Sequence, residues 1–127
     1  MTGADPLETF RRARLTAEEA LNAEALDRLA RLPRLGEQPL TAIIPLLITD
    51  HLAHAWDIGH ALRLDLRLDA DLLEDSFAWA RTNILRAPGL FGPELGPASD
   101  ANQQTRWLAY LGRASLRDDA GSRREAD

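Results

Sequence analysis

The sequence has 127 residues, of which 45% are hydrophobic and 28% are charged, and its formal net charge is −5. This size and composition are typical of one globular domain that buries roughly two thirds of its unfolded surface. Cysteine and lysine are absent, which excludes thiol catalysis, disulfides, cysteine zinc sites and lysine Schiff bases. The acidic balance argues against a nucleic-acid partner, and neither a signal pattern nor an apolar run of bilayer-spanning length is found. We therefore expect a cytoplasmic protein with no membrane contact.

The N-terminal part predicts a helix over about residues 6–24. Asp5 and Pro6 suit its cap and first position, and apolar residues repeat at the helical period in Leu7, Phe10, Ala17 and Leu21. The sequence does not fix where this helix ends, because residues 23–32 could continue it. The prolines and glycine that follow forbid a long element, so residues 31–38 are expected to form a loop or an extended connection.

A second helix is expected over about residues 41–63, with Thr41 as its cap. Pro45 falls in the first turn, where a missing N–H costs little. Its apolar residues lie on more than one side, which is typical of a helix packed between neighbours. This segment is therefore predicted to be the central helix, and its buried polar residues need partners.

Two further helices are expected in the C-terminal half. The first covers about residues 70–86 and is capped by Asp69, and the second covers about 101–111, with a capping box at Asp100 and Gly112 after its end. The 87–99 segment between them holds three glycines and three prolines, so it is a lid or a packed wrapping segment. The sequence thus predicts an all-α fold of about four helices, one domain over 1–113 and a disordered tail over 114–127.

The central helix carries the candidate site. Asp50, His54 and Asp57 are spaced four and three residues apart, so they share one side of the helix. That arrangement is typical of two metal ligands with an orienting carboxylate, or of an acid/base pair. His51 points elsewhere, in line with an apolar stripe of the same helix.

Several segments resemble one known family. His54-Ala55-Trp56-Asp57-Ile58, with Asp50 four residues earlier, resembles the His-x-Trp-Asp-Leu helix of mycothiol-dependent maleylpyruvate isomerase-like proteins, the actinobacterial branch of the DinB-like four-helix bundles. The likeness continues, in the right order and spacing, through Leu68–Leu72, Arg86–Glu94 and Leu108–Arg113. It covers most of residues 5–113.

The resemblance implies a divalent metal, such as zinc or nickel, held by three protein ligands, with isomerisation or thiol transfer on a small molecule. Asp50 and His54 match two of the ligands. The early histidine of the family has no counterpart, since no histidine precedes His51. The chain is thus expected to lack the helix that carries it. Either a second chain supplies the missing group or the metal site is lost, and a homodimer that completes the bundle is the simplest repair.

Each candidate residue also has a structural interpretation. His54 is a metal ligand, or a buried histidine bonded to Asp50 or Asp57. Asp50 is a ligand or base, or it pairs with an arginine. His51 is expected in the core or in a dimer contact, and His60 is expected to be exposed. The tryptophans are expected in the core: Trp56, Trp79 and Trp107.

Two functional hypotheses remain. In the first, the protein is an acid/base or metal-dependent enzyme of isomerase or transferase type, in which Asp50, His54 and Asp57 act on a small organic molecule or a thiol conjugate. In the second, it is a non-catalytic binding module or partner subunit of the same ancestry that has lost its metal. The retained acidic and imidazole groups favour the first hypothesis, and the missing third ligand favours the second.

Overall fold

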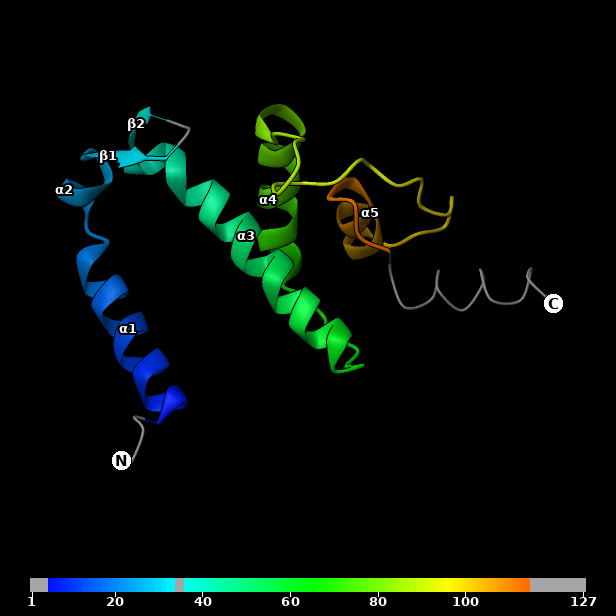
Figure 1. Ribbon diagram of the computed structural model, residues 1–127, viewed down its shortest axis with the longest axis horizontal. Coiled ribbons are helices and arrows are strands. Elements are labelled where there is room, and N and C mark those ends of the chain that lie inside the picture. Colours follow the sequence, from blue (N-terminus) through cyan, green and yellow to red (C-terminus); the bar gives the residue numbers. More distant parts are fainter. Residues whose placement is uncertain (1–4, 34–35, 115–127) are drawn as a thin grey trace. The chain divides into compact units, whose positions relative to one another are not determined.

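The computed structural model describes residues 5–33 and 36–114 and is mostly helical (Figure 1). Helices dominate as predicted, but a small antiparallel sheet interrupts them, so the fold is not purely α. Residues 115–127, most of the predicted tail, lie outside the described residues. In chain order the elements are α1 (Pro6–Ala20), α2 (Ala23–Leu26), β1 (Leu29–Leu32), β2 (Gly36–Pro39), α3 (Leu40–Ala61), α4 (Ala70–Asn83) and α5 (Gln103–Tyr110).

The chain divides into two compact units, Met1–Ile44 and Pro45–Asp127. In the first unit, Asp5 caps α1 as predicted by accepting a hydrogen bond from the Leu7 N–H at 3.0 Å. The helix ends at Ala20 rather than near residue 24, because Asn22 is extended and caps the short α2 through the Ala25 N–H at 2.9 Å. Within the described part of α1, no residue is buried.

The sheet consists of β1 and β2, which pair antiparallel from Leu29 opposite Pro39 to Leu32 opposite Gly36. Gly36 adopts a φ of 71°, which a side chain would disfavour. This pair takes the place of the expected loop or extended connection. Strands of four residues are at the lower limit of length at which alternation predicts a strand in a sequence.

The second unit is built from α4, α5 and the part of α3 after Ile44. Asp69 caps α4 as predicted, but Asn102 rather than Asp100 caps α5, through the Thr105 N–H at 2.8 Å. Gly112 follows α5 with a φ of 82°, as expected of a glycine after a helix. The core is formed by residues of all three helices and of the turn after α5: Ala53, Leu73, Ala80, Trp107, Leu108 and Leu111.

A chain of buried hydrogen bonds crosses this core. The Trp107 indole N–H donates to Ser76 Oγ at 2.9 Å, Ser76 Oγ lies 2.7 Å from Thr49 Oγ1, and Thr49 donates to the Pro45 carbonyl at 2.9 Å. Because the indole only donates and the carbonyl only accepts, the Ser76 hydroxyl must donate to Thr49. The resulting one-way relay links α5, α4 and α3, and its three side chains are 2% exposed or less.

In residues 5–33 and 36–114, no helix combines the length and the apolar character needed to cross a lipid bilayer.

Thr49→Val tests the relay, because valine keeps the shape of threonine but leaves the Ser76 hydroxyl without an acceptor. We expect the free energy of unfolding, measured in urea, to fall by about 1–3 kcal/mol. Thr82→Val is the matched control, since the exposed Thr82 hydroxyl bonds to the Trp79 carbonyl of its own helix. That variant should change stability by less than about 0.5 kcal/mol, and equal losses in both variants would contradict the relay.

Candidate functional site

The candidate site lies on the side of α3 that faces away from the core. Asp50 and His54 come together there as predicted, with 3.3 Å between Asp50 Oδ1 and His54 Nε2. The two side chains are 49% and 63% exposed. The interpretation of His54 as a buried core histidine is therefore wrong, because Asp50 and His54 both lie on the surface.

The second nitrogen of His54 lies close to Asp57, with 3.4 Å between His54 Nδ1 and Asp57 Oδ2. Each ring nitrogen therefore has a carboxylate beside it, Asp50 at Nε2 and Asp57 at Nδ1. Because a carboxylate only accepts, the two compete for the one N–H of a neutral imidazole. The orienting role of Asp57 stays a prediction.

Asp57 is itself fixed by Arg113, a residue to which the sequence analysis gave no role. Arg113 Nε lies 2.7 Å from Asp57 Oδ1, and the second guanidinium nitrogen Nη2 lies 2.8 Å from Oδ2. Such a two-pronged bond fixes both groups in one plane. Arg113 reaches this position because Gly112 reverses the chain after α5, and the Arg113 N–H then bonds to the Leu108 carbonyl at 2.9 Å.

Asp50, His54, Asp57 and Arg113 form a row of neighbouring charged and polar groups. Within this row, Arg113 and His54 shift the pKa of the Asp57 carboxyl group that lies between them. The hydrogen bonds from Arg113 lower the pKa of Asp57, burial opposes this effect, and His54 adds a smaller contribution in the same direction as Arg113. Asp57 in turn raises the pKa of Arg113, against the effect of burial, and Asp50 adds to this. Asp57 therefore stays ionised beside His54 to a pH below its ordinary range.

The spacing of the first two groups fits a shared divalent ion. Two ligands at neighbouring corners of a tetrahedron lie about 3.3 Å apart when each bond is about 2.0–2.1 Å long, and the Asp50–His54 gap is 3.3 Å. Over the described ranges, however, no three histidine or acidic side chains gather closely enough to hold a metal. Here the described residues thus offer two candidate ligands, with the Asp57 carboxylate beside one of them.

The other two histidines differ in part from what was expected. His51 is exposed, so it is not in the core, while the alternative of a dimer contact stays a prediction; its Nδ1 lies 2.7 Å from the Leu47 carbonyl of its own helix. His60 is partly buried rather than exposed: its ring stacks on Trp56 at 4.5 Å, and its Nδ1 is buried without a hydrogen-bond partner among the described residues. Trp107 is fully buried as predicted, and Trp56 and Trp79 pack against the core.

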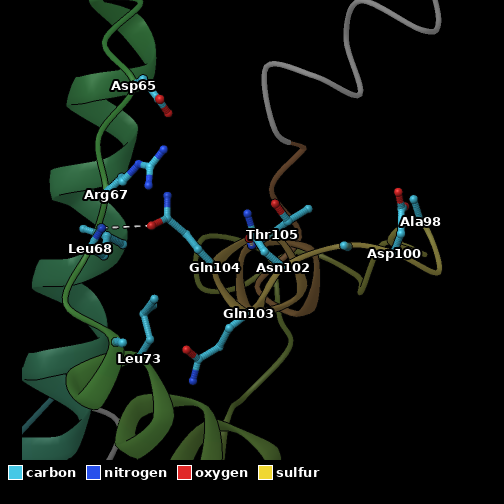
Figure 2. Close-up of a pocket in the computed structure, with 12 residues that line it drawn as sticks. Asp65, Arg67, Leu68, Leu73, Ala98, Asp100, Asn102, Gln103, Gln104 and Thr105 are labelled. Atoms are coloured by element: carbon cyan, nitrogen blue, oxygen red, sulfur yellow. Dashed lines mark hydrogen bonds between the residues drawn. The ribbon is translucent and has the colours of Figure 1, made fainter.

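The second unit also has a pocket of about 640 Å³, shown in Figure 2. It lies between the connection from α3 to α4 and the start of α5, and Gln104 joins these walls by bonding to the Leu68 N–H at 2.9 Å and the Leu66 carbonyl at 2.8 Å. Charged side chains of both signs, including Asp65, Arg67 and Asp100, line the pocket. None of the predicted site residues lines it, so the pocket and the Asp50–His54 pair are separate features.

Comparison of the chain with protein-family models, with curated proteins and with solved structures gave no match. The likeness to mycothiol-dependent maleylpyruvate isomerase-like proteins therefore stays a prediction.

The Asp57–Arg113 pair makes stability depend on pH. A carboxyl group whose pKa is lower in the folded protein than its unfolded value of about 3.9 stabilises the fold above that value. This contribution is lost as the pH falls through the folded pKa. We expect the stability advantage of the wild type over Asp57→Asn, measured by urea unfolding at about pH 6, to shrink on acidification.

The Arg113→Gln background is the control for this measurement. Without the guanidinium, the effect of Asp57→Asn should lose most of its pH dependence. An equal pH dependence in both backgrounds would show that Arg113 does not lower the pKa of Asp57.

Proposed function

We propose that the protein is a small metal-dependent or acid/base enzyme that acts on a small organic molecule at the exposed side of α3. The observation that carries this proposal is the row Asp50–His54–Asp57–Arg113, in which each group positions the next. Proteins use such series of contacts to fix the tautomer and the orientation of a catalytic or metal-binding imidazole. The resemblance to the isomerase-like proteins supports an isomerase or transferase, with a thiol conjugate as one class of substrate.

Each residue has a distinct role in this proposal. Asp50 Oδ1 and His54 Nε2 would hold a divalent ion such as zinc or nickel, which supplies a Lewis acid for a carbonyl group or for water. With the ion bound, Asp57 would accept the His54 Nδ1–H, which would leave the Nε2 lone pair for the ion. Arg113 keeps Asp57 ionised and in plane. In the acid/base form, the same His54 Nε2 takes a proton from the substrate, and Asp57 stabilises the imidazolium.

A second candidate function is a non-catalytic binding module or partner subunit of the same ancestry. It is favoured by the exposure of both Asp50 and His54, and because the part of the chain that the structure describes supplies only two ligands where catalytic metal sites usually have three. Metal binding separates the metal form of the first candidate from the second, because a module that has lost its metal retains no specific affinity for a divalent ion.

His54→Ala tests the proposed metal site. Since His54 is exposed, its removal should change the free energy of unfolding by less than about 0.5 kcal/mol, yet it should abolish specific zinc or nickel binding in a titration against a chelating dye. Asp57→Asn should weaken that binding by about 10–100-fold, because it removes only the orienting carboxylate.

Glu74→Gln is the control, as it removes an exposed carboxylate on α4, a different helix from the one that carries Asp50, His54 and Asp57. It should leave metal affinity unchanged. Equal metal binding by the wild type and His54→Ala would contradict the metal form of the proposal, and so would no binding by the wild type, which would leave the acid/base form and the non-catalytic candidate.

A further inference from the structure

We propose that the pocket in Figure 2 binds a free α-amino acid with a cationic side chain, of the arginine or lysine type. Arg67 would bind the carboxylate of this ligand, Asp65 its α-ammonium group, and Asp100 the cation at the end of its side chain. The lining residues all lie in the second unit. They are separate from the Asp50–His54 pair, so this inference does not depend on the proposed function.

The pocket has the size and the fixed walls of a small-molecule site. Its volume of about 640 Å³ falls within the range of about 300–1,000 Å³ that ligand pockets occupy. Gln104 holds its two walls together, since the Gln104 amide accepts from the Leu68 N–H at 2.9 Å and donates to the Leu66 carbonyl at 2.8 Å. The walls are therefore in place before a ligand binds.

The charged side chains that line the pocket have no partners within the protein. Throughout residues 5–33 and 36–114, Asp65, Arg67 and Asp100 form neither an ion pair nor a side-chain hydrogen bond. Elsewhere in the same unit, by contrast, the guanidinium groups of Arg86 and Arg113 bond to carbonyl or carboxylate oxygens of the chain. The guanidinium and the two carboxylates at the pocket are thus available to a ligand.

Asp65 and Arg67 suit the head group of an α-amino acid. They are two residues apart in a connection without helical structure, and Figure 2 shows both side chains extending toward the start of α5. The carboxylate and ammonium of an amino acid are joined through one carbon, so they can meet two neighbouring opposite charges together. A guanidinium donates two parallel hydrogen bonds to a carboxylate, and the Asp65 carboxylate accepts from an ammonium.

The rest of the pocket suits an aliphatic side chain that ends in a cation. Leu73 belongs to the core and Leu68 packs against it, and both line the pocket. The methylene groups of arginine or lysine lie along such apolar surface while their charged ends stay in a polar environment. Asp100 supplies that environment on the wall opposite Asp65 and Arg67. Together, the three charged side chains carry one net negative charge, which an amino acid with one net positive charge complements.

Titration of the protein with L-arginine, followed by the NMR shifts of the pocket amides, tests this inference. We expect a Kd of about 1 mM or lower. Arg67→Gln, Asp65→Asn and Asp100→Asn should each weaken the binding of L-arginine by about tenfold or more, because each removes one charge-assisted contact.

Analogues that lack one charged group separate the three contacts. Agmatine lacks the carboxylate, so Arg67→Gln should not weaken its binding. N-acetyl-arginine lacks the α-ammonium and should bind equally to the wild type and Asp65→Asn. Norvaline lacks the side-chain cation and should bind equally to the wild type and Asp100→Asn.

Arg81→Gln and Glu74→Gln are the matched controls, since both residues are exposed on α4 and neither lines the pocket. These controls and His54→Ala should bind L-arginine as the wild type does. No shift of the pocket amides at about 10 mM L-arginine, ten times the expected upper limit of the Kd, would overturn the inference. Equal weakening in the pocket variants and the controls would also overturn it, as would agmatine binding that falls as much as L-arginine binding in Arg67→Gln.

Discussion

The buried relay from Trp107 through Ser76 to Thr49 is the constraint on which the rest of the second unit depends. Helix α3 has large apolar residues on its exposed side, among them Leu47, Ile58 and Leu62, so hydrophobicity alone does not decide which side it buries. On its buried side, Ala53, Leu52 and Trp56 pack in or against the core, and the Thr49 hydroxyl is removed from water there and finds its partner in Ser76. The relay adds a directional constraint to the rotation of α3 about its axis, because any other rotation would leave these buried hydroxyls without partners.

This rotation also determines where the candidate site lies. Thr49 and His54 are five residues apart, which places them on roughly opposite sides of the helix. Burial of Thr49 therefore turns Asp50 and His54 outward, where they remain accessible to an ion, a substrate or another chain. Asp57 lies at the border between the two sides, where Arg113 reaches it from the turn after α5. The relay thus affects which side of α3 faces outward, and the Asp57–Arg113 ion pair connects the site on α3 to the turn after α5.

Much of this arrangement follows from local sequence. The cap at Asp69, the glycine after α5 and the common side of Asp50, His54 and Asp57 depend on residues a few positions apart, and all were predictable. The role of Arg113 was not, because it acts on a residue 56 positions away and its place depends on how α5 packs. The β1–β2 pair was missed because its strands are short. The relay could have been suspected only from a threonine and a serine in buried helical positions.

The exchange of the three tryptophan indole N–H protons with D₂O, followed by NMR, tests this account most directly. The Trp107 N–H is buried and bonded to Ser76, so it should exchange only when the whole unit unfolds. It should also show nuclear Overhauser contacts to Ser76 and Thr49. Trp56 and Trp79 are only partly buried, and their indole protons should exchange much faster. A Trp107 proton that exchanges as fast as theirs, or lacks those contacts, would contradict the relay and the orientation of α3 that depends on it.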